Sequence, residues 1–153
     1  MGSVQSGEGR IMKFPSEKWF EAVRTVYNSD SSLHSGGGGA CHTRAGFSIG
    51  DHHYLIEFDG MECARIREMD LADLEDADFI IRMPVDLWRS MIDNIQSNGK
   101  ADLDHTLNSL DLSEAEGIAY SPVDDQYRQD LFYRYNQNFQ DFFDASSRVP
   151  TSF

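Results

Sequence analysis

The chain has 153 residues, with 13 Lys and Arg against 26 Asp and Glu and a formal net charge of −13. That length suits one domain, and a hydrophobic fraction of 40% with 12% aromatic residues is enough for a packed core. No run approaches the ~18 apolar residues of a membrane span and no secretory signal opens the chain, which predicts a cytoplasmic protein without stable membrane insertion. The acidic surface excludes nucleic acid as a partner.

The first helix is expected just after a leader rich in Gly and Ser. Residues 1–13 lack hydrophobic periodicity and are interpreted as a disordered leader or an expression remnant. From Phe14 onward, apolar residues recur at intervals of three and four, which predicts an amphipathic helix over residues 15–28 with Pro15 in its first turn. Four consecutive glycines at 36–39 then predict a flexible loop.

Four segments with period-two alternation predict β-strands. They cover residues 41–49, 53–59, 61–67 and 78–83. The second and third are joined at Asp59-Gly60, a dipeptide typical of two-residue hairpin turns. The acidic segment 68–76 is either a loop or one short helical turn. Strands with a single apolar face predict an antiparallel sheet, and we expect helices to cover that face.

Helices are predicted again in the second half of the chain. Apolar residues from Leu87 to Ile95 follow Pro84 and predict a helix that ends at Asn98-Gly99. Leu103, Leu107 and Leu110 predict a short helix, and 124–145 predict a long aromatic one. These elements indicate one α+β domain over residues 14–147, with a layer of antiparallel or mixed sheet of four to five strands covered on one face by helices, and a tail over 148–153.

Several short sequences in this order of elements resemble the sterol carrier protein 2 domain. They are Phe14-Pro15-Ser16-Glu17 with Trp19-Phe20, Tyr54-Leu55-Ile56-Glu57-Phe58 with Asp59-Gly60, Ala77-Asp78-Phe79-Ile80-Ile81-Arg82, and Asp86-Leu87-Trp88 with Met91-Ile92. The resemblance covers about residues 14–98 and implies a lipid tunnel between sheet and helices. Such domains continue into a Gly-Lys-Leu strand, whereas Gly99-Lys100 here leads into a helix-like segment. A fifth strand is therefore either delayed to 117–120 or absent.

The resemblance implies a carrier for a hydrophobic small molecule: a fatty acyl, sterol-like or isoprenoid ligand. The side chains expected to bind it are Phe47, Ile56, Phe79, Trp88, Met91, Ile95, Phe139, Phe142 and Phe143. The aromatic residues of the last helix have two interpretations. They either pack on the sheet as core, or close the pocket as a movable lid, because an amphipathic helix depends on docking for its stability.

Two other functions stay open. A small cofactor-independent enzyme, such as a cyclase, isomerase or hydratase, would use the same pocket with an acid or base such as His105, Asp104 or Tyr135. An interaction module would present the aromatic helix to a partner protein. No catalytic residue is assigned, and the sequence does not predict the oligomeric state.

We expect no cofactor and no metal. His42, His52 and His53 lie close in sequence to Cys41 but lack the spacing of a zinc site. Cys63 is the second cysteine, and both are interpreted as buried thiols, with a disulfide left open.

Three arginines of the predicted strands also have two interpretations. Arg65, Arg67 and Arg82 either clamp a carboxylate head group or belong to a solvated ion network.

Overall fold

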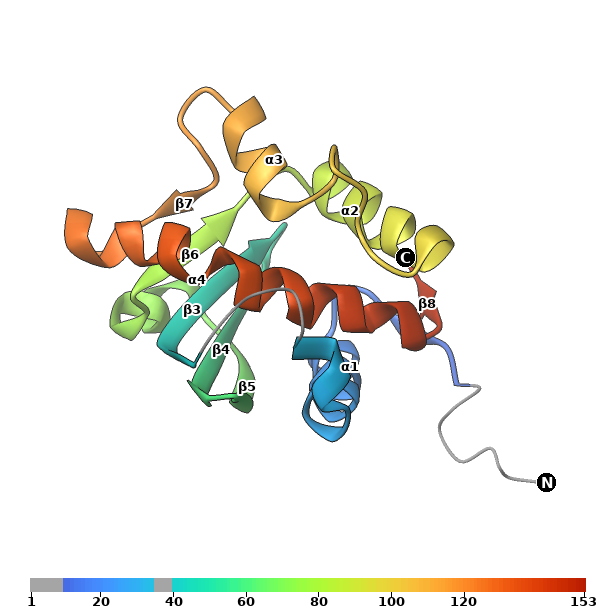
Figure 1. Ribbon diagram of the computed structural model, residues 1–153. Helices are drawn as coiled ribbons and strands as arrows, with labels where there is room; N and C mark the ends of the chain where they lie inside the picture. The colour runs from blue at the N-terminus through green and yellow to red at the C-terminus, as the bar shows by residue number, and fades with distance from the viewer. Residues whose placement is uncertain (1–9, 35–39) are drawn as a thin grey trace.

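A mixed sheet lies at the centre of the computed structural model, which describes residues 10–34 and 40–153 (Figure 1). Within those residues the sheet has five strands in the spatial order β5-β4-β3-β6-β7. The strands are β3 (Cys41–Ile49), β4 (His52–Gly60), β5 (Glu62–Met69), β6 (Phe79–Arg82) and β7 (Ala119–Tyr120). The expected leader up to residue 9 and the four-glycine loop lie outside the described residues.

The register confirms the four predicted strands and corrects two details. Asp59 pairs with Glu62, so the hairpin turns at Gly60 and Met61 rather than at Asp59-Gly60, with Gly60 at a φ of 73°. The strand β6 runs parallel to β3, and only its pairing with β7 is antiparallel. The reason is that β5 lies at one edge of the sheet. After β5 the chain crosses over β4 and β3, and β6 is then placed beside β3. Period-two alternation reports a strand but not its direction.

Helices cover the main face of the sheet, which carries Phe47, Ile56 and Phe79 (Figure 1). They are α1 (Glu17–Ser29), α2 (Val85–Asn98), α3 (Leu107–Ser113) and α4 (Gln126–Asp144), with the 3-10 turns η1 (Ser31–His34) and η3 (Ala145–Arg148). In the figure α4 crosses the whole width of the sheet. The α1 cap is Ser16, whose hydroxyl accepts the Trp19 N–H at 3.0 Å, so Pro15 precedes the helix instead of opening it.

The second face of the sheet, which carries Gly46, Leu55 and Ile80, is partly covered as well. The acidic segment forms the 3-10 turn η2 (Leu71–Asp76), and its Leu74 is completely buried with Leu55 and Ile80. Leu74 approaches so closely that a Cβ on Gly46 would lie 3.1 Å from it. The glycine therefore makes room for η2, and the sheet has a small second apolar cluster that the sequence did not predict.

A short strand near the start of the described chain pairs with one near its C-terminal end. Strand β2 (Met12–Lys13) pairs in parallel with β8 (Thr151–Ser152). Strand β2 precedes the expected domain boundary at residue 14, and β8 follows the expected boundary at residue 147. A strand of two residues is too short to show hydrophobic periodicity. The sequence therefore does not predict the pairing of β2 with β8.

The region between α2 and α4 settles the question of the fifth strand. Residues Ala119–Tyr120 form β7, inside the expected range 117–120. The Asp111 carboxylate accepts the Ile118 N–H at 2.8 Å and so holds the chain that enters the strand. The predicted short helix begins at Leu107, whereas Leu103 is 87% exposed and precedes it. None of the described helices combines the length and apolar character needed to cross a membrane.

Candidate functional site

The nine side chains expected to bind a ligand are all completely buried over the main face of the sheet. Strands β3, β4 and β6 each contribute one of them, α2 contributes three, and α4 contributes three. These nine side chains come together because of two periodicities. Alternate positions of a strand face one side of the sheet, and every third or fourth position of a helix faces the same buried layer. The apolar interior is thus built by elements that are far apart in the sequence.

Aromatic rings from α4 occupy the space above the strands. The Phe47 ring centroid lies 5.4 Å from that of Phe143 and 5.7 Å from that of Phe139. Phe139 also meets Phe79 at 5.6 Å, in an edge-to-face arrangement. Trp88 of α2 closes the group at 6.0 Å from Phe47. These are the separations at which aromatic pairs attract one another, so α4 packs on the sheet through its aromatic rings.

Phe20 and Phe58 are two of the interior residues that were absent from the expected lining. Phe20 of α1 lies 6.4 Å from Phe142 and 6.2 Å from Phe143, measured between ring centroids. Phe58 of β4 lies 4.9 Å from Phe139. Both were on the predicted apolar faces of their segments. Hydrophobic periodicity therefore indicated that both residues are buried. It did not indicate which of the buried residues contact the last helix.

Polar groups are buried along the same elements, among them Asn138, Gln140 and Asp141 of α4. The Trp88 indole N–H donates to the backbone carbonyl of Ser48 at 3.1 Å. In the part of the chain that the structure describes, the buried hydroxyls of Tyr54 and Ser146 have no hydrogen-bond partner. Burial raises the pKa of Tyr54, with smaller contributions from Glu68 and Glu17, so this hydroxyl stays protonated. Such hydroxyls can bond to a polar group of a guest molecule.

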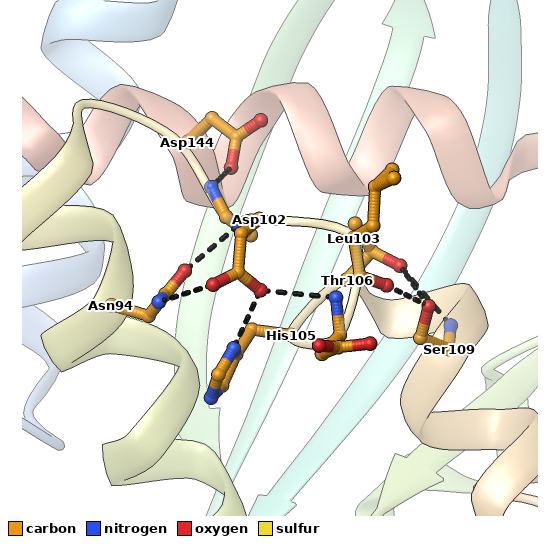
Figure 2. A network of polar contacts seen from close by, with 9 residues as sticks. Asn94, Asp102, Leu103, His105, Thr106, Ser109 and Asp144 are labelled. Atoms are coloured by element: carbon orange, nitrogen blue, oxygen red, sulfur yellow. Dashed lines mark hydrogen bonds and ion pairs between the residues drawn. The ribbon is translucent and has the colours of Figure 1, made fainter.

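Two of the three acid or base groups named for an enzyme, His105 and Asp104, lie outside this interior. His105 is on the loop between α2 and α3, and its Nδ1 lies 2.7 Å from the Asp102 carboxylate (Figure 2). This hydrogen bond is the largest cause of the lowered pKa of Asp102. Asp104 is exposed, and its N–H donates to the same carboxylate. Tyr135 is a buried residue of the main apolar cluster, and the Arg134 guanidinium lies 5.4 Å from its ring centre.

The contacts in Figure 2 tie the loop to two helices. Asn94 of α2 exchanges hydrogen bonds with Asp102 through its side-chain nitrogen and oxygen. The Asp144 carboxylate of α4 accepts the Ala101 N–H at 3.0 Å. At the other end of the loop, the Ser109 hydroxyl of α3 donates to the Leu103 carbonyl. The network therefore positions the loop, and it gives His105 a structural role on the surface.

The three neighbouring histidines have separate partners. His42 lies 3.3 Å from Asp59 and His52 lies 2.9 Å from Glu68. His53 Nδ1 is 2.8 Å from the Ser48 hydroxyl. Across residues 10–34 and 40–153, no three His, Cys, Asp or Glu side chains are grouped as a metal ion would require. Cys41 and Cys63 are buried free thiols.

The three arginines do not form one clamp. Arg65 pairs with Glu57 at 3.3 Å and shares a polar groove on the second face with Arg67. Arg82 lines a different pocket, where its guanidinium carbon lies 4.9 Å from the centre of the Tyr120 ring. The interpretation in which all three arginines clamp one carboxylate head group is therefore wrong, because β5 and β6 lie on opposite sides of the β3-β4 pair.

Comparison with solved structures supports the fold. A crystal structure of sterol carrier protein 2 superposes on this chain with a TM-score of 0.57 at 12% sequence identity, over 88% of this chain and 97% of that chain. At such low identity the likeness concerns the fold alone, and it confirms the α+β class expected from the sequence. No protein-family model matches the chain, and no curated protein matches it.

Proposed function

We propose that this protein carries a hydrophobic small molecule between the main face of its sheet and helices α2 and α4. The observation that carries the proposal is the convergence of nine apolar side chains from sheet, α2 and α4 on one buried layer. The similarity of the fold to that of sterol carrier protein 2 adds to it. A fatty acyl, sterol-like or isoprenoid chain suits such a layer, because its transfer from water gains about 25 cal/mol per Å² of apolar surface before binding costs.

A bound ligand has to replace aromatic contacts that the rings make with one another. Phe139 and Phe143 of α4 lie on Phe47, so a guest between them displaces α4 from the sheet. The movable part is α4, whose outward side chains Tyr127 and Tyr133 are 72% and 52% exposed. The helix is stabilised by docking rather than by its own hydrogen bonds, and a ligand can supply equivalent apolar contacts.

This arrangement makes a kinetic prediction for the carrier. If α4 must leave the sheet first, the observed rate of ligand entry reaches a plateau as ligand concentration rises, because opening becomes rate-limiting. Stopped-flow mixing with a fluorescent fatty acyl probe measures this rate. A rate that grows linearly without limit would indicate a preformed open tunnel instead.

The decisive experiment has two arms. Native mass spectrometry of protein purified without detergent is expected to show a co-purified hydrophobic molecule, or the purified protein is expected to bind the fluorescent fatty acyl probe at one site. Phe139→Leu is then expected to change probe affinity several-fold, since Phe139 touches Phe47, Phe58 and Phe79. Leu74→Ala is the matched control, because it creates a core vacancy on the second face, away from the proposed site.

The control separates binding from stability. If Leu74→Ala and Phe139→Leu change probe affinity equally, the effect follows loss of stability and the proposed location is wrong. Failure of the wild-type protein to bind any acyl or sterol-like probe would overturn the carrier function itself.

A further inference from the structure

A pocket of about 490 Å³ lies on the second face of the sheet, opposite the aromatic interior. Three of its side chains stand in one row across adjacent strands, because Ser48 pairs in register with His53 of β4 on one side and with Arg82 of β6 on the other. Directly paired residues share a face of a sheet, with side chains about 5 Å apart. The row therefore presents a hydroxyl, an imidazole and a guanidinium to one space.

The polar groups of this row are held in place. The Ser48 side chain is 4% exposed and its hydroxyl is hydrogen-bonded to His53 Nδ1 at 2.8 Å. The backbone of Ser48 is fixed by the Trp88 indole on the opposite face. Arg82 is oriented by the Tyr120 ring, and none of the described carboxylates lies within ion-pair distance of it. A guanidinium without a carboxylate partner, beside a fixed hydroxyl, has donors left for an anion.

The rest of the lining is largely apolar. Leu71 of η2, Met83, Pro84 and the face of Tyr120 enclose the row. Among the described residues of the lining, Asp51 in the turn between β3 and β4 is the acidic side chain. Its negative charge opposes dianions such as phosphate, whereas a single carboxylate meets the guanidinium with less repulsion.

We propose that this pocket binds a small organic carboxylate with an apolar or aromatic body. The carboxylate accepts hydrogen bonds from Arg82 and from the Ser48–His53 pair, and the body lies against Leu71, Pro84 and Tyr120. This site is independent of the proposed carrier function, because the sheet separates it from the aromatic interior. Its occupant is a soluble acid rather than a long acyl chain.

Benzoate is the test ligand, with benzamide as its neutral isostere and inorganic phosphate as the simple anion. Ligand-observed NMR, together with the imidazole resonances of His53, measures binding to the wild-type protein. We expect benzoate to bind at least about tenfold more tightly than benzamide or phosphate, since the guanidinium contact is charge-assisted. Equal binding of benzoate and benzamide would overturn the proposal, and so would absence of benzoate binding at tens of millimolar.

Two arginine variants locate the site. Arg82→Gln is expected to weaken benzoate at least about tenfold. Arg67→Gln removes the same charge from an exposed position of the same face, in the neighbouring groove, and is expected to leave the affinity within about twofold. Because both side chains are exposed, both variants are expected to fold. Equal loss in the two would show a general effect of net charge, and no loss in Arg82→Gln would place the benzoate elsewhere; either result rejects the pocket.

Discussion

Trp19 and Thr151 are 132 positions apart in the chain, yet the Trp19 indole N–H donates a hydrogen bond of 2.9 Å to the Thr151 hydroxyl. That hydroxyl in turn donates to the Val149 carbonyl at 2.7 Å. Trp19 is completely buried, and its ring meets Phe14 edge-to-face at 4.7 Å. The last residues of the chain therefore complete the environment of a core tryptophan, and β8 is part of the fold.

Replacement of this hydroxyl tests the contribution of the C-terminal strand. Thr151→Val keeps the shape of the side chain but leaves the indole N–H without its acceptor. We expect a loss of about 1–3 kcal/mol in the free energy of unfolding, the cost of an unsatisfied buried donor. Urea denaturation followed by tryptophan fluorescence measures it. Thr25→Val is the control, because Thr25 is exposed on α1, and its change is expected within about 0.5 kcal/mol. Equal effects of the two variants would contradict the role of β8.

A second prediction concerns the entry to β7. Gly117 has a φ of 75°, and a Cβ there would lie 2.7 Å from an oxygen of the Asp111 carboxylate. Gly117→Ala is therefore expected to cost more than about 1 kcal/mol through left-handed strain and displacement of that carboxylate. Amide hydrogen exchange should show the loss concentrated at Ile118, whose N–H donates to Asp111. Gly60→Ala separates the two causes, since Gly60 has a φ of 73° but open space around it.

Much of the secondary structure could be predicted from hydrophobic periodicity, because every long helix or strand that buries one face repeats its apolar residues with that period. Strand β3 and helix α2 match their predicted ranges to within one residue, and Trp88 and Phe58 are buried as expected. Periodicity does not show which helices and strands become neighbours in the folded protein. The parallel pairing of β6 with β3 and the pairing of β2 with β8 depend on contacts between distant segments, which leave no local pattern.

The sites divide in the same way. The apolar residues over the main face were predictable because each faces the core of its own element. The row of His53, Ser48 and Arg82 was not, since three polar residues on three strands become neighbours only through the register. The sequence placed Arg82 with Arg65, and the order of strands separates them.

A third prediction uses the buried thiols. Burial is the largest cause that raises the pKa of both Cys41 and Cys63 to about 12. The unfolded chain loses these protons above about pH 8.5, whereas the folded protein keeps them. Because the unfolded state then binds fewer protons, the free energy of unfolding is expected to hold steady up to about pH 8.5 and to fall as the pH rises further.

Denaturant titrations between pH 7 and pH 10 measure this slope, and Cys63→Ala is expected to reduce it. Native protein should also react with a thiol reagent at least about 100-fold more slowly than unfolded protein, since reaction requires an opening of more than ~3 kcal/mol. Rapid labelling of two thiols in the native protein would contradict the burial of both.

The last prediction decides what α4 contributes to the fold. The sequence left two interpretations for its phenylalanines, of which packing as core is the commoner for such a stripe, and a lid would let their truncation spare stability. In the structure the Phe142 ring is completely buried and lies 5.8 Å from the Tyr27 ring and 6.1 Å from the Phe58 ring. We therefore expect Phe142→Ala to cost about 3–5 kcal/mol, as for other large-to-small changes in a core.

Urea denaturation of Phe142→Ala, beside Phe58→Ala and the exposed Tyr127→Ala, measures how firmly α4 is held. The first two are expected to lose similar free energy and the third almost none, since Tyr127 is 72% exposed on the same helix. That result means a ligand must compensate a large part of the docking energy of α4, which predicts slow entry and exit. If Phe142→Ala instead leaves unfolding unchanged while weakening binding of the fatty acyl probe, α4 is a loosely attached lid, and ligand exchange should be fast.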